Sequence, residues 1–227
     1  LNVLGGKAMA ESQQYTLNNR VAWHEGAIYH DLSDPSWQAV KINKEGWEIV
    51  KNPPILFRRY SHQKKAIIPG HSSSSRQALE NILGLYCLEE RVITLKDAEK
   101  FNLLTRRDFR KVNLIGRFIP GIPQLIHIDH GPQGSSKTTI ARAEKTLIDP
   151  SAVQALSMPK DKTEAVQQLS HHWFLVYDNI SYIPQWLSDL FCRAVTGDGF
   201  SKRELYTDDD DIIYSFRRCI TINGINA

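Results

Sequence analysis

The turn from Gly131 to Thr138 constrains the fold of this chain more than any other stretch, and it reads Gly-Pro-Gln-Gly-Ser-Ser-Lys-Thr. An apolar run ending at Asp129 precedes it and a helical pattern follows it, which is the setting of a phosphate-binding loop. In the pattern G-x-x-x-x-G-K-[ST], backbone N–H groups surround the phosphates, the lysine reaches the β and γ oxygens, and the hydroxyl holds Mg²⁺. The sequence therefore predicts a site for ATP and Mg²⁺.

The predicted nucleotide contacts run from the turn into the helix that follows. They are Gly131, Gln133, Gly134, Ser135, Ser136, Lys137, Thr138 and Thr139. Ser136 departs from the pattern, because it places a Cβ atom where a glycine backbone would approach phosphate. The alternative reading is a Gly/Ser-rich turn that contains a lysine by chance.

Polar residues that follow two later apolar runs complete the predicted site. Asp178 follows Trp173–Tyr177, and we expect it to hold Mg²⁺ with Thr138 because the two strands concerned would be adjacent. Asn223 follows Cys219–Ile222 and is predicted to orient the attacking water. Ordinary turns at Asp178 and at Asn223-Gly224 are the alternatives.

The catalytic set predicted from these patterns is Lys137, Asp178, Asn179 and Asn223. Asn179 directly follows Asp178, and a neutral amide orients water without accepting a proton, so either another carboxylate acts as the base or hydrolysis is slow. Asp189 and the acidic run 208–211 are candidate bases, although a solvated turn also explains the run.

The arrangement of segments predicts an α/β fold, namely a P-loop NTPase with a central parallel sheet flanked by helices and a small β-rich module before it. Short strands are expected between Asn19 and Tyr60, and a hairpin is expected before the last strand. Predicted strands are 21–23, 27–29, 39–42, 47–50, 55–57, 125–129, 173–177 and 219–222, and predicted helices are 76–89, 108–118, 137–147 and 161–169. The predicted domains are 1–70 (β-rich), 71–120 (helical linker) and 121–227 (ATPase core).

Composition narrows the functional classes. Of the 227 residues 41% are apolar, yet no apolar run approaches the roughly 20 residues of a membrane helix. Cys87, Cys192 and Cys219 are far apart and lack metal-ligand spacing, so a reduced cytoplasmic setting without membrane or zinc is predicted. The net charge of +3 arises before residue 76, where basic and aromatic residues alternate between Phe57 and Lys65. This stripe suits nucleic acid, or a solvated face.

Two further groups of side chains, a pair of histidines and a set of tryptophans, are of types that can bind metal ions or nucleic-acid bases. His171 and His172 are predicted to form a polar loop end, because adjacent positions point opposite ways and no third metal ligand is suitably spaced. The three tryptophans of the β-rich part are predicted to pack a small core, with base stacking as the alternative. These are Trp23, Trp37 and Trp47.

Three motifs carry a family resemblance: Leu190–Gly199, Arg203–Tyr206 and Thr221–Gly224. With the loop at Lys137, they resemble the helicase half of viral-type primase-helicases, which is AAA+-like and belongs to superfamily III, and prophage and plasmid ATP-binding proteins. The resemblance implies an ATP-hydrolysing motor, a homo-oligomer such as a ring of six subunits, that replicates a mobile element on single-stranded or forked DNA. It also implies that the hairpin grips DNA through Lys202, Arg203 and Tyr206.

Other readings remain open. A nucleotide-regulated DNA-binding or assembly module would use the same site with little or no hydrolysis. A small-molecule kinase is less favoured, because only Arg142 stands in the helix after the loop. A fifth strand and a subunit-bridging arginine are expected beyond Ala227, so the chain is predicted to be part of a longer protein. Arg203, Arg217 and Arg218 are candidates to face a neighbouring subunit or DNA, and for Arg203 a salt bridge within the hairpin is the alternative.

Overall fold

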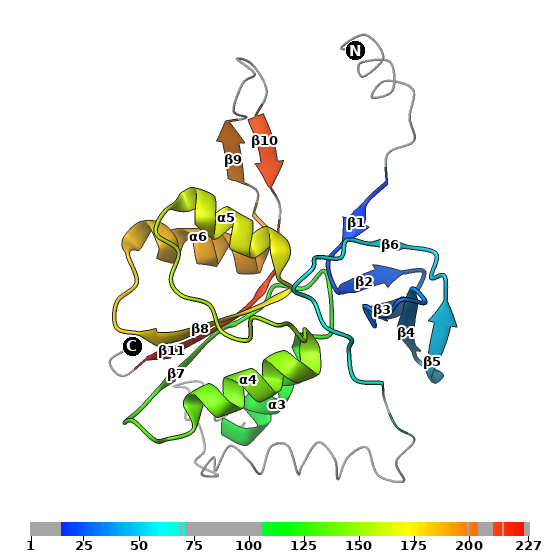
Figure 1. The fold of residues 1–227 in the computed structure, drawn as a ribbon, viewed down its shortest axis with the longest axis horizontal. Helices are drawn as coiled ribbons and strands as arrows, with labels where there is room; N and C mark the ends of the chain where they lie inside the picture. The colour runs from blue at the N-terminus through cyan, green and yellow to red at the C-terminus, as the bar shows by residue number, and fades with distance from the viewer. Residues whose placement is uncertain are drawn as a thin grey trace, which may run out of the picture.

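The computed structural model describes residues 15–68, 70, 106–198, 200–203, 211–214 and 216–224. The fold is mixed α/β, with a β-rich amino-terminal part beside a three-stranded parallel sheet that carries helices on both faces (Figure 1). The predicted helix 76–89, Cys87, Tyr206 and most of the acidic run lie outside the described residues. Every helix in the described ranges is too short or too polar to span a bilayer.

The β-rich part is a meander with a short additional pair of strands. Strands β2 (Val21–His24), β3 (Ala27–Asp31), β4 (Gln38–Asn43) and β5 (Gly46–Lys51) pair antiparallel in sequence order. Strands β1 (Leu17–Asn18) and β6 (Leu56–Phe57) pair parallel. Glu25 and Gly26, both with positive φ, form the two-residue turn that such hairpins favour. The predicted strands of this part are confirmed.

The prediction that the three tryptophans pack a core is wrong for two of them. Trp23 is 57% exposed and Trp37 is 53% exposed, whereas Trp47 packs beside Val40 and Leu32. Trp23 lies on β2, at the edge of the meander, and the guanidinium carbon of Arg59 lies 4.0 Å from the centroid of the Trp37 ring. Ala22, which precedes Trp23 on β2, packs in the apolar cluster of the meander, and successive side chains of a strand point to opposite faces.

The parallel sheet has the strand order β7 (Ile126–His130), β11 (Cys219–Gly224), β8 (Phe174–Ile180). Its central strand is buried along its whole length, as parallel strands covered on both faces are. We expected β8 to lie next to the strand that precedes the loop, and this is wrong because β11 lies between them. The order of strands along a chain does not fix their order in a parallel sheet, since crossover connections can leave room for a later strand.

Helices cover both faces of this sheet (Figure 1). Helices α3 (Arg106–Gly116) and α4 (Lys137–Ile148) pack on the face that presents Phe174, Val176 and Cys219. Helices α5 (Lys162–His171) and α6 (Gln185–Thr196) pack on the face that presents Leu175, Tyr177 and Ile220. The alternation along β8 follows from the two-residue period of a strand. The sequence did not predict α6.

Before β11, strands β9 (Phe200–Arg203) and β10 (Asp211–Tyr214) pair antiparallel, which confirms the predicted hairpin. The hairpin extends away from α3 and α4 (Figure 1). Lys202 and Arg203 lie on β9.

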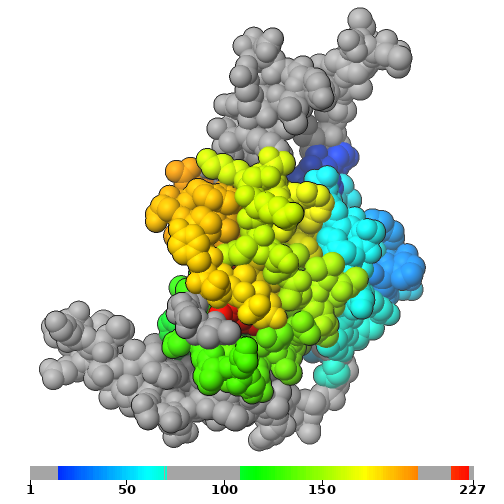
Figure 2. Space-filling model, turned by 60° about the vertical axis from the view of Figure 1, so that its left-hand side comes forward, coloured from blue at the N-terminus to red at the C-terminus, as the bar shows by residue number. Residues whose placement is uncertain are grey.

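The β-rich part and the parallel-sheet part share one core. Val21 of β2 belongs to the same apolar cluster as Ile148 and Trp173. The Arg20 side chain is fully buried, and its Nε donates to Asp149 Oδ1 at 2.8 Å. Figure 2 shows the two parts in direct contact.

Candidate functional site: a loop and two strand ends

Three residues with positive φ turn the chain between β7 and α4. They are Gly131 (φ 150°), Gly134 (φ 79°) and Ser136 (φ 61°). Ser136 precedes the first residue of α4 and takes the left-handed conformation that glycine adopts freely. For a residue with a Cβ this conformation costs about 1–2 kcal/mol. The serine therefore does not prevent the loop from forming, but it leaves the backbone strained.

Lys137 folds back onto the turn. Its Nζ donates to the carbonyl oxygens of Gly131 (2.7 Å) and Pro132 (2.8 Å) and to Ser135 Oγ (3.0 Å). The ammonium group thus lies at the amino end of α4, where the first backbone N–H groups have no partner within the helix and the helix dipole is positive. The free backbone N–H groups at the start of the helix and the positive charge of Lys137 lie at one place, and together they suit an anion.

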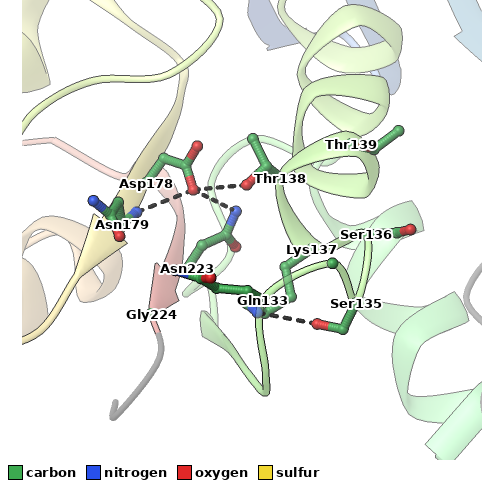
Figure 3. A pocket seen from close by; sticks show the side chains of 11 residues that line it. Gln133, Ser135, Ser136, Lys137, Thr138, Thr139, Asp178, Asn179, Asn223 and Gly224 are labelled. Atoms are coloured by element: carbon green, nitrogen blue, oxygen red, sulfur yellow. Dashed lines mark hydrogen bonds between the residues drawn. The ribbon is translucent and has the colours of Figure 1, made fainter.

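Asp178, at the carboxyl end of β8, is the point where the three segments meet (Figure 3). Its Oδ1 accepts hydrogen bonds from Thr138 Oγ1 (2.9 Å), from the backbone N–H of Asn179 (3.0 Å) and from Asn223 Nδ2 (3.4 Å). Thr138 is the second residue of α4, and Asn223 lies on β11. Residues far apart in the sequence are therefore in hydrogen-bonding contact.

A cavity of about 410 Å³ opens between the loop and the two strand ends. Gln133–Thr139, Asp178, Asn179, Asn223 and Gly224 line it. All predicted nucleotide contacts except Gly131 are in this set. In Figure 3 the side chains of Ser136 and Thr139 point away from Asp178.

The two asparagines differ in their surroundings. Asn179 is exposed and has a φ of 60°, a conformation that asparagine tolerates better than most residues. Asn223 is only 1% exposed, and within the described part of the chain its Oδ1 has no hydrogen-bond partner. Asn223 thus has a buried acceptor that no described residue uses.

A network of buried charges, which the sequence did not predict, lies behind the site. Glu144 of α4 accepts hydrogen bonds from Arg110 Nε (3.0 Å) and from Arg117 Nη1. Arg117 Nη2 also donates to Thr221 Oγ1 (2.8 Å), two residues before Asn223. The signal in the sequence is the spacing of Arg110, Asn113 and Arg117, which places polar residues on one helical face.

Asp129 connects this network to β7. Its Oδ1 accepts from His127 Nε2 (2.9 Å) and from Arg110 Nη1 (3.4 Å). Burial acts to raise the pKa of Asp129, but the hydrogen bond from His127 and the positive charges of His127, Arg110 and Arg117 outweigh it and lower this pKa. Asp129 is therefore ionised at neutral pH and can only accept hydrogen bonds.

Several candidates from the sequence lie away from the cavity or are used within the chain. Asp189 accepts from Gln185 Nε2 on the exposed side of α6. Arg217 donates to the carbonyl oxygens of Thr196 and Gly121. Arg218 donates to the carbonyl oxygen of Leu169, and its guanidinium lies over the ring of Phe216. Both guanidinium groups therefore have partners within the chain, and the expectation that they face a neighbour or DNA stays a prediction.

The paired histidines do not form a polar loop end. The His62 ring lies 4.3 Å from the His172 ring and 6.3 Å from the His171 ring, so the two neighbours do not point to opposite sides. His171 ends α5 and His172 caps it, and a helix end does not impose the alternation of a strand. Burial and the charge of Lys145 lower the pKa of His172 to about 3. The described residues contain no group of three or more side chains suited to a metal ion.

Residues 102–227, more than half of the chain, match the family of actinomycete integrative conjugative element replication proteins. The chain belongs to this family. The predicted link to replication of a mobile element is confirmed.

No curated protein matches the chain. Two apo structures of the NrS-1 C-terminal region resemble it, each at 10% identity, with TM-scores of 0.39 and 0.35. The matches cover 87% and 88% of this chain, and the chain spans only 54% of each solved chain.

Proposed function

We propose that residues 121–227 are an AAA+-like P-loop ATPase core and that the chain is an ATP-hydrolysing, helicase-like motor in the replication of a mobile element. One observation carries the proposal: Lys137 and Thr138 of the loop, Asp178 of β8 and Asn223 of β11 line the same cavity. A chance lysine in a Gly/Ser-rich turn would not require a carboxylate and an amide from two other strands at its mouth. Membership in a family of replication proteins supports the biological setting.

The cavity suits the phosphates of ATP. The amino end of α4 supplies N–H donors and a positive dipole, and Lys137 adds a full charge. Its Nζ is held by the carbonyl oxygens of Gly131 and Pro132, which the β and γ oxygens would replace as acceptors. The cavity prefers a polyphosphate because these N–H groups and Lys137 point into it, and not because its lining is apolar.

The residues at the cavity also fit Mg²⁺. Thr138 Oγ1 and Asp178 Oδ1 lie 2.9 Å apart, and hydroxyl and carboxylate oxygens are ligands that Mg²⁺ prefers. Bound by these residues, Mg²⁺ would neutralise charge on the β and γ phosphates. Loss of either oxygen is expected to weaken binding of ATP with Mg²⁺ more than binding of ATP alone.

In the proposed reaction the oxygen of a water molecule bonds to the γ-phosphorus while the bond to the β–γ bridging oxygen breaks. The products are ADP and inorganic phosphate, and one proton is released. The chain contributes charge from Lys137 and orientation from Asn223, whose Nδ2 donates hydrogen bonds at the cavity.

Asn179 favours a second candidate, a nucleotide-regulated DNA-binding or assembly module. Asn179 lines the cavity next to Asp178, and its amide does not accept a proton. In this alternative ATP orders an assembly and turnover is slow or absent.

The partners of the proposed motor are single-stranded or forked DNA and further copies of the chain, as in a hexameric ring. The β9–β10 hairpin supplies a projecting element, and Lys202 and Arg203 lie on its first strand (Figure 1). We propose that these residues, with Tyr206, contact the DNA. Positive side chains bind the phosphate backbone and aromatic rings stack on unpaired bases.

The first prediction tests catalysis. We expect the chain to hydrolyse ATP faster with single-stranded or forked DNA, and Lys137→Ala to reduce kcat/KM at least tenfold, since it removes a charge aimed at the transferred phosphoryl group. Lys162→Ala is the matched control, because Lys162 is also the first residue of a helix and is exposed. Equal rates for the unaltered chain and Lys137→Ala would contradict the proposal. Tight ATP binding without turnover, even with DNA, would favour the alternative.

A further inference from the structure

Three polar side chains form a row across the carboxyl edge of the parallel sheet. They are Asp129 on β7, Asn223 on β11 and Asp178 on β8. Asn223 is in register with Asp129 on one side and donates to Asp178 Oδ1 on the other. Residues in register on adjacent parallel strands point to the same face. The side chain of Asn223 therefore lies between two carboxylates, of which only Asp178 lines the cavity.

The hydrogen bonds in this row leave one oxygen unused in each of two side chains. Asn223 uses Nδ2 toward Asp178, and Asp129 uses Oδ1 toward His127 and Arg110. Asn223 Oδ1 and Asp129 Oδ2 are buried and, among the described residues, have no hydrogen-bond partner. Buried polar atoms nearly always find a partner, and two acceptors cannot bond to each other. A water molecule can donate one hydrogen to each of them.

Asp129 is itself held firmly. Arg110 links it to Glu144 of α4, and Arg117 links Glu144 to Thr221 of β11. Thr221 lies two residues before Asn223 and on the same face of the sheet. The carboxylate beside Asn223 is thus tied both to the helix that begins with Lys137 and to the strand that carries Asn223.

We propose that Asp129 is a positioning residue for the ATPase reaction: through a water shared with Asn223 Oδ1, it keeps Nδ2 of Asn223 turned toward Asp178 and the cavity. This inference rests on the proposed function. Without Asp129 the amide keeps only the long hydrogen bond from Nδ2 to Asp178 Oδ1 (3.4 Å) and can turn away from this orientation. Asn223 would then be present but wrongly oriented toward the γ-phosphate.

Hydrolysis by the full chain tests this role. Asp129→Ala is expected to lower kcat about tenfold, the size expected when one hydrogen bond in the transition state is misplaced, and to leave KM for ATP within about twofold. Asp129→Asn keeps an oxygen acceptor and is expected to stay within about threefold of the unaltered kcat. Asp189→Ala, which removes an exposed carboxylate on α6, is the matched control and should change neither.

Two further measurements distinguish a positioning role of Asp129 from a role in stability alone. Both Asp129 variants lose the ion pair with Arg110, so both should lower the unfolding midpoint by a similar amount. In contrast, kcat should fall in Asp129→Ala, which lacks the oxygen acceptor, and be largely kept in Asp129→Asn, which retains it. In an Asn223→Ala background Asp129→Ala should cause no further loss of kcat, because its effect passes through Asn223.

The outcomes separate this inference from the proposed function. Unaltered kcat in Asp129→Ala, a loss of kcat that tracks stability in both variants, or a full additional loss in the Asn223→Ala background would overturn the inference alone. Absence of hydrolysis by the unaltered chain would overturn the proposed catalytic function together with it.

Discussion

Ser136 shows how one residue can depart from a sequence pattern and still preserve the geometry that the pattern describes. The position before Lys137 needs a positive φ, and the serine adopts 61°. Glycine is common at such positions because it has no Cβ to oppose that conformation. The loop is therefore defined by the backbone that its residues can reach rather than by glycine itself.

This strain predicts that Ser136→Gly stabilises the chain by roughly 0.5 kcal/mol, since relief of about 1 kcal/mol of left-handed strain exceeds the added entropy of the unfolded glycine. Urea unfolding monitored by tryptophan fluorescence measures the difference. Ser36→Gly is the control, because Ser36 is an exposed turn residue outside the positive-φ set, and it should lower stability slightly. A destabilised Ser136→Gly chain would contradict the assigned backbone conformation.

At the scale of elements, the junction between α5 and β8 depends on a neutral histidine. His172 is 6% exposed, and its Nδ1 lies 3.4 Å from Lys145 Nζ. Burial first, and then the positive charge of Lys145, lower its pKa to about 3. The nearby Asp149 carboxylate accepts from the backbone N–H groups of Trp173 and Phe174, where β8 begins.

The junction makes stability depend on pH. The pKa of His172 is about 3 in the folded chain and about 6.5 in the unfolded chain, so the unfolded chain binds more protons below pH 6.5. Lowering the pH from 7.5 to 5 should therefore cost about 2 kcal/mol of unfolding free energy through this residue. Urea unfolding at both pH values should show a smaller loss for His172→Gln and an unchanged loss for the control His24→Gln. An equal pH dependence in all three chains would argue against a buried neutral His172.

Much of the element pattern could be predicted from local sequence. The strands of the β-rich part, the β9–β10 hairpin and helix α4 follow from periodicity and turn residues. Helix α6 was not predicted, although its buried residues Leu187, Phe191, Ala194 and Val195 repeat at helical spacing. Most of this stretch was considered only as the motif Leu190–Gly199 of the family resemblance.

The strand order and the buried charges could not be predicted in this way. The position of β11 between β7 and β8 depends on packing between segments distant in the chain. The contact of Arg117 with Thr221 joins residues 104 positions apart. A role for Asp129 was not predicted, since its partner Arg110 and its register neighbour Asn223 come from other elements. The loop, Asp178 and Asn223 were found because each follows an apolar run that is visible on its own.

Arg20 joins the β-rich part of the molecule to the parallel-sheet part. Its guanidinium donates to Asp149 Oδ1 (2.8 Å), Ser33 Oγ (2.8 Å) and the carbonyl oxygen of Pro150 (3.0 Å). Asp149 ends α4 and also pairs with Lys145 at 2.7 Å. Burial alone would raise the pKa of Asp149, but the charges of Lys145 and Arg20 hold it well below its ordinary value.

We expect Arg20→Ala to lower the free energy of unfolding by about 3 kcal/mol or more, because it leaves buried acceptors and half of a buried ion pair without a partner. Urea unfolding of the full chain measures this loss. Arg58→Ala, which removes an exposed arginine of the same part, should change stability by less than about 0.5 kcal/mol. A loss in Arg20→Ala no larger than in Arg58→Ala would show that the two parts do not depend on this contact.

The proposed function requires that the loop at Lys137 and the ends of β8 and β11 enclose a triphosphate. A crystal structure of the chain with Mg²⁺ and a non-hydrolysable ATP analogue would show this. We expect the β and γ phosphates at the amino end of α4 in contact with Lys137, with Mg²⁺ held by Thr138 and Asp178 and the γ-phosphate facing Asn223. An analogue bound elsewhere, or a loop in which Lys137 stays on the carbonyl oxygens of Gly131 and Pro132 at saturating analogue, would contradict it.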